Sequence, residues 1–547
     1  NKESIAYQYL EIRKSQSGAD VRKLFDDENH RSLLLYNCRD VWDMTALEIV
    51  GGVDGIFNLF DGLQLMRIND IFTHTLKIEP NALRFCMLNN VVSPSKQFIV
   101  GDIEQGALVH EPKIGKILNN VVMLDFSRFY ISIILALQVS PENLKGNEKK
   151  LFTVLPNGQK LDEPMYFLPA LSRYLIDARN DAEEKKLTVE NDLLKEYWKS
   201  QATSLKTLTS GLWGYISNSA NVEKNQKASR YYAPHIADQI LQESRRKSLA
   251  LKGFIENNEI VNKNYEVVYG DTDASLIQSE EEEGKHYTEI KPEKIAEDVN
   301  IFLQSISDAD NYPYPILVKP ELMYDRLCLV GKKYYYGRVI WEDGKYLDDP
   351  RFDIKGMQTK RGDNSQLSKD FQMQLIKNHL EFGEDGIFDT IKITRKLIMT
   401  NLKKIQANIY DEDVYYFLRS VDKPLKIRKD FKDYNSPLWK KYELSCIAWN
   451  NYVRLNNLGV DNLLQKNTTG YLLEVKFCDV DGLILDNKYL AFSDPLLLDW
   501  KKIELDFVNI LEKTIFQKIK NILKSLGFSE TRIKSASKGR IVKNPFE

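Results

Sequence analysis

The stretch Val267–Asp273, read VVYGDTD, places two carboxylates one residue apart at the end of an apolar run. Val267 and Val268 are typical of a buried strand, and the Gly270–Asp271 pair favours a turn that starts a second strand. Such a turn presents Asp271 and Asp273 at one edge of a sheet. Because Mg²⁺ prefers hard oxygen ligands, often shared with substrate phosphates, the pattern indicates a metal site.

A second acid occupies a similar position upstream. Asp125 closes the apolar, β-branched run Val121–Leu124 and is followed by Phe126 and the segment Ser127–Ile134, read SRFYISII. Taken singly, an acid at a strand end is more often a turn residue or a helix cap. Two such strand ends in one chain predict instead a pair of metal ions that stabilise both the attacking and the leaving oxygen in phosphoryl transfer.

Two helices are expected between these acids. The first runs from Pro169 toward Thr188 and carries Arg179, and the second runs from about Leu193 to Leu212 and carries Lys206 away from its apolar face. A lone helical Lys or Arg is usually a solvated surface residue. Their order between the two acids favours a role on a triphosphate.

With these elements in order, the chain resembles family B DNA polymerases. DFSRFYISII at Asp125–Ile134 resembles motif A, KTLTSGLWG at Lys206–Gly214 is similar to motif B, and YGDTD at Tyr269–Asp273 is identical to motif C. Gly331–Gly337 resembles the Lys-Lys-x-Tyr element, and Lys355–Asp363 resembles the Lys-Gly-x4-Arg-Arg-Asp element. The resemblance extends from about residue 36 to at least residue 525.

The resemblance implies a fold of the α+β class with several domains. Its parts would be a palm with an antiparallel sheet, fingers formed by a helical hairpin and a mainly helical thumb. The expected boundaries are an exonuclease remnant at 1–50, linker helices and the first part of the palm at 51–165, fingers at 166–217, the second part of the palm at 218–330 and the thumb at 331–547.

The resemblance also implies a role for each matched residue. Asp125 and Asp273 would bridge two Mg²⁺ ions, for which Mn²⁺ is the expected substitute, with Asp271 as an auxiliary catalytic acid and Phe126 among the metal-binding positions. Tyr130 would exclude a 2′-hydroxyl from the sugar site. The remaining nucleotide-binding positions are Ser127, Arg128, Phe129, Arg179, Lys206, Ser210, Trp213 and Thr272. The DNA-binding positions are Lys332, Lys333, Tyr335, Lys355 and Arg361.

Several positions depart from the family pattern. Ser210 and Gly211 stand where motif B usually has Asn and Ser, and Trp213 stands in place of a Tyr. Arg128 and Ile131 replace the usual Ser and Pro of motif A. On the first finger helix, Glu183 occupies a position that is often Lys. These changes predict altered nucleotide affinity or fidelity, whereas the intact acids predict retained catalysis.

The N-terminal segment resembles the end of a 3′–5′ exonuclease domain. Tyr36 and Asp40 fit its third motif, Tyr-x3-Asp. The first two motifs should precede residue 1, and the sequence Asp102–Glu104 only imitates the first of them, at the wrong place in the order. Since proofreading needs acids from all three motifs, it is not expected from this chain alone. A truncated chain and a naturally split polymerase both remain open.

Composition neither demands nor opposes nucleic-acid binding. The 547 residues carry 76 Lys and Arg against 78 Asp and Glu, so the cations of a DNA-binding cleft would have to be local. Five scattered cysteines argue against a zinc site or a disulfide framework and are typical of a reducing compartment. No segment reaches the roughly 18 apolar residues of a membrane span, and no signal peptide is recognised.

The sequence therefore predicts a DNA-templated DNA polymerase that extends a primer 3′-hydroxyl and releases pyrophosphate. The short interval between Asp125 and Lys206 leaves little room for the insertion of protein-primed relatives. An inactive scaffold is the main alternative, and a reverse transcriptase or RNA polymerase is a lesser one.

The expected partners are primer–template DNA and deoxynucleoside triphosphates. A second subunit or missing N-terminal segment and a sliding clamp remain open, and no membrane partner is expected. The expected location is the cytoplasm or nucleoid, or a site of viral or plasmid replication. It is the nucleus only in a eukaryote, and secretion is not expected.

Overall fold

The computed structural model describes residues 31, 34, 74–101, 106–143, 149–223, 225–257, 265–279, 291–357, 365–409, 418–421, 441–464 and 470–529. Tyr36, Asp40, Asp102–Glu104 and Arg361 lie outside these residues, so the predictions made for them are not tested by the structure. Among the helices of the described ranges, none combines the length and the apolar character needed to cross a bilayer.

The chain divides into two compact units, and neither is continuous in sequence. Unit 1 comprises residues 1–108, 125–260 and 295–319, and unit 2 comprises residues 109–124, 261–294 and 320–547. Helices and antiparallel strands occur together, which confirms the α+β prediction. The palm, fingers and thumb boundaries remain predictions.

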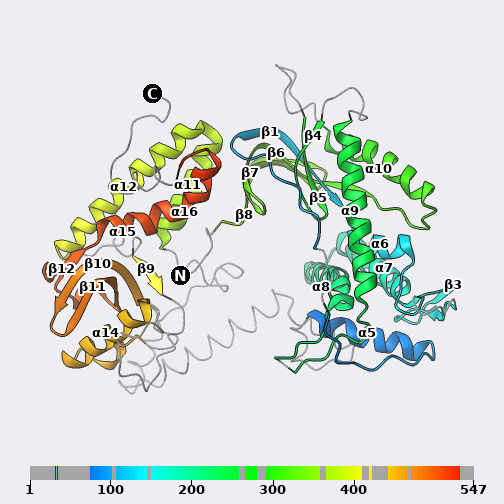
Figure 1. Ribbon diagram of the computed structural model, residues 1–547, viewed down its shortest axis with the longest axis horizontal. Helices are drawn as coiled ribbons and strands as arrows, with labels where there is room; N and C mark the ends of the chain where they lie inside the picture. The colour runs from blue at the N-terminus through cyan, green and yellow to red at the C-terminus, as the bar shows by residue number, and fades with distance from the viewer. Residues whose placement is uncertain are drawn as a thin grey trace. The chain divides into compact units, whose positions relative to one another are not determined.

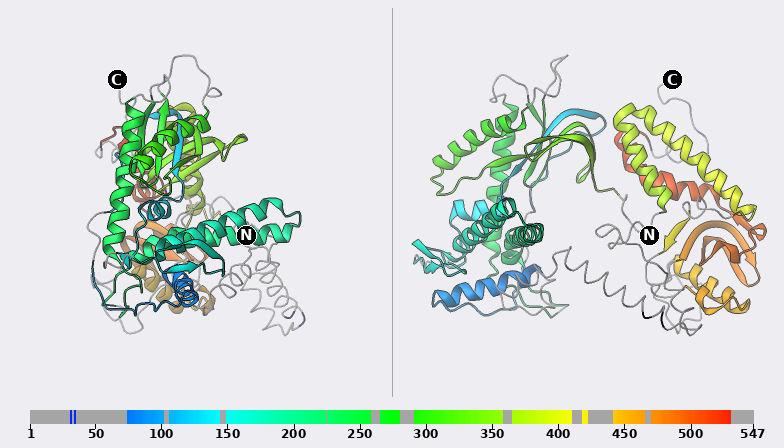
Figure 2. Two further views of the ribbon diagram at one scale, coloured as in Figure 1. Left: turned by 90° about the vertical axis from the view of Figure 1, so that its right-hand side faces the viewer. Right: turned by 180° about the vertical axis from the view of Figure 1, so that it is seen from behind.

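Unit 1 is mainly helical. Its helices are α5 (His74–Leu88), α6 (Phe129–Leu137), α7 (Phe167–Thr188), α8 (Asp192–Ser217), α9 (Pro234–Glu256) and most of α10 (Pro292–Ala309), and β2 (Phe152–Val154) pairs with β3 (Lys160–Met165). Helices α7 and α8 form the predicted hairpin, which Figure 2 (left) shows as two long helices side by side.

An aromatic cluster holds the base of this hairpin in unit 1. Phe167, at the start of α7, stacks on Tyr231 with ring centroids 4.0 Å apart. On its other sides it meets Phe85 of α5 at 5.8 Å and Phe152 of β2 at 5.5 Å. Because all four rings leave water together, their burial fixes the first turn of α7 against α5 and the small hairpin.

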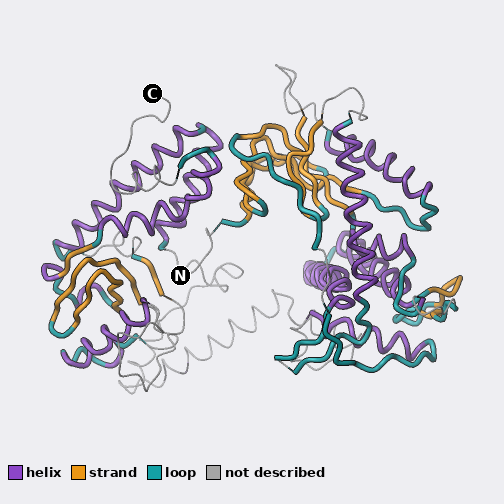
Figure 3. The backbone as a smooth tube through the Cα atoms, viewed as in Figure 1, coloured by secondary structure: helices purple, strands orange, loops and turns teal. Residues whose placement is uncertain are grey.

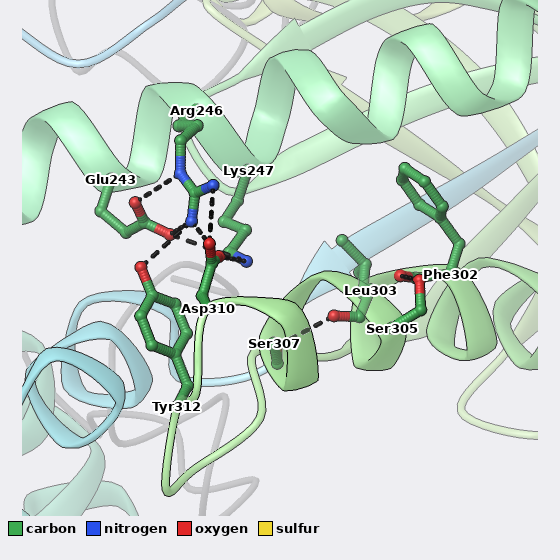
Figure 4. Close-up of polar contacts among 9 residues, drawn as sticks. All are labelled: Glu243, Arg246, Lys247, Phe302, Leu303, Ser305, Ser307, Asp310 and Tyr312. Atoms are coloured by element: carbon green, nitrogen blue, oxygen red, sulfur yellow. Dashed lines mark hydrogen bonds and ion pairs between the residues drawn. The ribbon is translucent and has the colours of Figure 1, made fainter.

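A charged cluster joins α9 to the chain that follows α10. Lys247 is fully buried, and its Nζ lies 3.3 Å from Asp310 and 3.7 Å from Glu243. Arg246 donates hydrogen bonds to both carboxylates and to the Tyr312 hydroxyl (Figure 4). The two cations are thus matched by two carboxylates, which makes burial of Lys247 tolerable.

Unit 2 contains a six-stranded sheet in the order β4-β5-β1-β6-β7-β8 (Figure 1). The strands are β1 (Ile117–Phe126), β4 (Tyr265–Asp271), β5 (Ala274–Ser279), β6 (Val318–Gly331), β7 (Tyr334–Glu342) and β8 (Lys345–Lys355), of which β1 and β6 each reach two residues into unit 1. The pairs β4–β5, β6–β7 and β7–β8 are antiparallel. Asp125 is the next-to-last residue of β1, and Asp271 ends β4, so both acids lie at strand ends as the sequence predicts.

The remainder of unit 2 carries a second core. Helices α11 (Gln366–Phe382), α12 (Glu384–Gln406), α14 (Lys441–Leu455), α15 (Phe507–Leu511) and α16 (Gln517–Ser525) are accompanied by strands β9 (Arg419–Val421), β10 (Gly470–Val480), β11 (Leu483–Phe492) and β12 (Ile503–Leu505). Short 3₁₀ turns lie at Val460–Asn462, Pro495–Leu497 and Trp500–Lys502, and a π-turn lies at Glu512–Phe516.

This region is less helical than the sequence predicts for 331–547. Strands β7 and β8 belong to the large sheet, and β9–β12 form a four-stranded sheet beside the helices (Figure 3). The stretch Trp500–Leu523, whose apolar residues recur at helical spacing, begins with a 3₁₀ turn and strand β12 and is helical only from Phe507 onward. Ile503 and Leu505 pair with Cys478 and Val475 of β10, so strand pairing prevails over the helical apolar spacing.

Candidate active site

The turn between β4 and β5 holds two of the three predicted catalytic acids. Thr272 adopts a left-handed conformation (φ 64°), and the Asp273 amide donates to the Asp271 carbonyl over 2.8 Å. The Thr272 hydroxyl donates to the Asp271 carboxylate over 3.2 Å. The turn thus holds both carboxylates at one end of the hairpin.

Gly270 lets another segment approach this turn. The His110 amide donates to the Gly270 carbonyl over 2.8 Å, and Val109 bridges to Asp271. A Cβ atom on residue 270 would come within 2.6 Å of the His110 ring, so only glycine fits without displacing it. Residues 109–110 therefore pack against the acidic turn.

The Asp273 carboxyl is in an unfavourable environment for a negative charge. Although its side chain reaches solvent, the surrounding protein removes part of its hydration and raises its pKa. The charges of Asp271 and Glu321 raise the pKa further, while the Asp273 amide and Lys333 lower it. A carboxylate held this way beside another carboxylate is a suitable ligand for a cation, so the donor set fits Mg²⁺.

The predicted DNA-binding lysines gather at one end of unit 2's large sheet. Lys333 lies in the β6–β7 turn, where its Nζ is 3.2 Å from Asp271 and its amide donates to the Tyr269 hydroxyl over 2.8 Å. Lys355, at the end of β8, pairs with Tyr335 at the start of β7. A Cβ atom on Gly356 would lie 2.5 Å from the Lys333 carbonyl, so glycine permits this close approach of the two segments.

The other two predicted DNA-binding residues in this region differ in exposure. The half-exposed Lys332 forms an ion pair with Glu111 over 2.5 Å. Tyr335 is only 8% exposed and packs edge-on against Tyr269, with ring centroids 6.2 Å apart. A DNA contact through the Tyr335 side chain stays a prediction.

The other acid-bearing segment belongs to unit 1. After Asp125, the buried Phe126 stacks on Phe129 with centroids 4.1 Å apart. The Ser127 amide donates to the Leu317 carbonyl over 2.8 Å, and its own carbonyl accepts from the Ser132 hydroxyl. These contacts fix the turn that leads from β1 into α6.

Aromatic rings connect this turn to α8. Tyr130 stacks with Trp213 at a centroid distance of 5.4 Å, and the Trp213 indole donates to the Ala237 carbonyl of α9 over 3.2 Å. The structure therefore brings together Tyr130 and Trp213, two positions predicted to flank the nucleotide.

Lys206 and Ser210 lie one turn apart on the exposed face of α8. The Ser210 hydroxyl donates to the Lys206 carbonyl over 2.9 Å, so it is engaged with its own helix. On α7, Arg179 is half-buried, and the following Asn180 accepts a hydrogen bond from Arg128. Neither Asn180 nor Tyr269 is predicted as a site residue, because no spacing rule marks a partner that lies in a distant segment.

The three predicted acids are divided between the two units. Asp125 belongs to unit 1, and Asp271 and Asp273 belong to unit 2. Within the part of the chain that the structure describes, no group of three or more His, Cys, Asp or Glu side chains is arranged as a metal site. Binding of one pair of metal ions by all three acids stays a prediction.

Comparison with known proteins identifies the family. The family model described as DNA polymerase family B matches residues 72–443, which is more than half of the chain. The chain belongs to DNA polymerase family B. This confirms the resemblance seen in the motifs.

Individual relatives are distant but match long segments. The chain is 24% identical over 442 residues to a DNA polymerase of Archaeoglobus fulgidus, covering 79% of this chain and 49% of that protein. It is 22% identical to the DNA polymerase delta catalytic subunit of Caenorhabditis elegans, covering 75% and 38%. It is 28% identical to the DNA polymerase alpha catalytic subunit of Arabidopsis thaliana, covering 63% and 20%. The chain thus spans half or less of the length of these relatives.

Proposed function

We propose that this chain is the polymerising part of a DNA-templated DNA polymerase, which extends a primer 3′-hydroxyl and releases pyrophosphate. Family membership supports this reaction class. The observation that carries the proposal is the Asp271–Thr272–Asp273 turn, where two carboxylates lie together and the pKa of one is raised. Two neighbouring carboxylates repel each other when no cation is bound, and such pairs are typical of cation-binding active sites.

We infer that Asp125 completes this site. Asp125 lies in the segment that resembles motif A, and Asp271 and Asp273 lie in the segment that is identical to motif C. Together with membership of DNA polymerase family B, these motifs support the proposal that all three acids, with the main chain of Phe126, bind two Mg²⁺ or Mn²⁺ ions.

Other residues of this chain would bind the nucleotide and select its sugar. When bound, the two ions would lower the pKa of the primer hydroxyl and offset the charge of the leaving pyrophosphate. Arg179 and Lys206 would bind the triphosphate, and the amides of Arg128 and Phe129 would donate to it. The Ser127 amide, which was predicted to join them, is already bonded to the Leu317 carbonyl. The Tyr130 ring, stacked on Trp213, would leave no space for a 2′-hydroxyl.

The same proposal assigns the parts of the fold. The six-stranded sheet would be the palm, the α7–α8 hairpin the fingers, and the region from α11 onward most of the thumb. Lys332, Lys333 and Lys355, gathered at one end of the palm sheet, would bind the primer–template backbone, and primer–template DNA and dNTPs would be the substrates. The proposal assigns no proofreading to this chain alone, and a second subunit and a sliding clamp stay predictions.

Primer extension tests the proposal directly. The purified chain, with Mg²⁺ and dNTPs, should extend a labelled primer, whereas the Asp125→Ala variant should bind the same DNA and fail to extend it. Extension by both proteins would refute the role of Asp125. DNA binding without extension by either protein would favour an obligate partner subunit or the scaffold alternative.

A further inference from the structure

The Arg128 side chain connects the segment after β1 to the first finger helix. Arg128 caps α6 in a left-handed conformation (φ 51°, ψ 45°), and its guanidinium donates a hydrogen bond to the Asn180 side-chain oxygen. Asn180 directly follows Arg179 on α7. The two arginines, 51 positions apart in sequence, are therefore brought into one neighbourhood of unit 1.

Neither guanidinium in this neighbourhood is matched by a carboxylate. Across the described ranges, no acidic side chain lies within ion-pair distance of Arg128 or Arg179. The buried Nε of Arg179 also has no hydrogen-bond partner there. Burial, followed by the charge of Arg128, lowers the pKa of Arg179, and Glu183 offsets this only in part. The Glu183 carboxylate is itself paired with Lys186.

Two unmatched cations held together are unfavourable unless an anion joins them. Another pair of cations in unit 1 is fully matched. Arg246 and Lys247 both form ion pairs with two carboxylates, those of Glu243 and Asp310. A guanidinium group binds phosphate oxygens through paired N–H groups, which an ammonium group cannot do in the same geometry. The Arg128–Arg179 pair is therefore suited to a polyphosphate.

We propose that the Arg128 side chain is a triphosphate-binding group that acts together with Arg179 and is oriented by Asn180. This assignment rests on the proposed polymerase function and deepens it, because it adds a second guanidinium to the nucleotide site. Arg128 lies three residues after Asp125, at the N-terminus of α6, so it would reach a triphosphate held beside that acid.

A purely structural role for Arg128 makes different predictions. In that case its hydrogen bond to Asn180 only fastens the start of α6 to α7, and its loss lowers thermal stability without changing anion affinity. Arg173 provides a matched control, since it is an arginine on α7 that is exposed and ion-paired with Asp177 over 3.2 Å. Arg173→Ala removes one positive charge, as Arg128→Ala does, and removes it from α7, the helix that carries Arg179 and Asn180.

Binding of inorganic tripolyphosphate to the purified chain, without DNA or metal, tests the proposal. Calorimetry should show that Arg128→Ala and Arg179→Ala each weaken binding by about tenfold or more, while Arg173→Ala changes it little. Asn180→Ala should have a smaller effect, because the charge remains but its orientation is lost. Unchanged affinity in Arg128→Ala, with only a lower melting temperature, would overturn the proposal.

A second variant keeps the proposal testable if Arg128→Ala does not fold. Arg128→Lys retains the charge but not the paired donors, so it should bind tripolyphosphate more weakly than the wild type, and equal binding would count against the proposal. In primer extension, either Arg128 variant should raise the KM for dNTPs more than Arg173→Ala does. If the wild type binds tripolyphosphate through Arg128 yet does not extend primers, the anion site stands and the proposed polymerase function fails.

Discussion

Two clusters of carboxylates in this protein show opposite electrostatic environments. In unit 1, Asp310 accepts hydrogen bonds from Arg246 and Lys247, and Arg246 is the main cause of its lowered pKa. In unit 2, Asp273 lies beside Asp271, and the pKa of its carboxyl is raised by desolvation and by like charge. Both clusters contain acids and lysines, yet only one has its charges matched.

This difference is the one expected between a structural cluster and the proposed metal site. The contacts around Asp310 satisfy Arg246 and the buried Lys247, so nothing further is needed to explain them. In the acidic turn, Lys333 forms an ion pair with Asp271. It offsets only part of the influences that raise the pKa of Asp273. Carboxylates with uncompensated charge are expected where a cation binds during function, because the bound cation neutralises them.

The largest expected effect distinguishes the two clusters by chemistry. Asp273→Asn should reduce the rate of primer extension by at least about a thousandfold, because stabilisation by a bound metal is worth several kcal/mol. Asp310→Asn should leave the rate within about threefold of the wild type, since it removes no proposed ligand. Rates under single-turnover conditions measure both. Comparable losses in the two variants would contradict the distinction.

The second effect concerns stability. Asp310→Ala should lower the free energy of unfolding by about 1–3 kcal/mol, because Lys247 stays buried with one carboxylate fewer. The folded-state pKa of Asp310 is lowered, so its contribution is present above the unfolded pKa of about 3.9 and is lost as pH falls through the lowered value. The difference between wild type and variant should therefore shrink at acidic pH.

Urea unfolding at neutral pH and at a series of pH values below the unfolded pKa of about 3.9 measures this effect. Asp308→Ala is a suitable control, because Asp308 lies in the last turn of α10, two residues before Asp310, and its side chain accepts a hydrogen bond only from the exposed Gln304 side chain, among the interactions described. An Asp310→Ala variant as stable as this control at neutral pH would show that Glu243 alone suffices to hold Lys247.

Sequence alone predicts the elements that carry chemistry better than the electrostatics between them. Strand β1, the β4–β5 turn and the α7–α8 hairpin all follow from local patterns of apolar residues and turn residues. The Arg128–Asn180 contact and the Lys247 cluster join segments tens of residues apart, and no local pattern specifies them.

Strand content in the C-terminal region was underestimated for a related reason. The stretch Trp500–Leu523 has apolar residues at helical spacing, yet Ile503 and Leu505 pair with β10, which lies about 30 residues earlier in the sequence. The spacing of apolar residues indicates only which side chains are buried within a stretch of about 11–18 residues. The partner strand that decides between helix and sheet is outside that window, so the four-stranded sheet was not predicted.

The smallest expected effect is a shift in pH dependence within the acidic turn. Lys333 lowers the pKa of Asp273, although desolvation outweighs it, so Lys333→Met should raise that pKa further. Binding of Mn²⁺ needs the ionised carboxylate, and the pH at which half of the binding is lost should therefore move upward. Electron paramagnetic resonance of free Mn²⁺ across a pH series measures this midpoint.

Lys332→Met is the matched control for this shift. Lys332 is the preceding residue, carries the same charge and forms its ion pair with Glu111 rather than with the acidic turn. It is not among the main causes of the pKa shift of Asp273. An equal upward shift in both variants would mean that Mn²⁺ binding responds to general surface charge. A shift confined to Lys333→Met would show that this lysine is the local counter-charge that keeps Asp273 ionised until a metal binds.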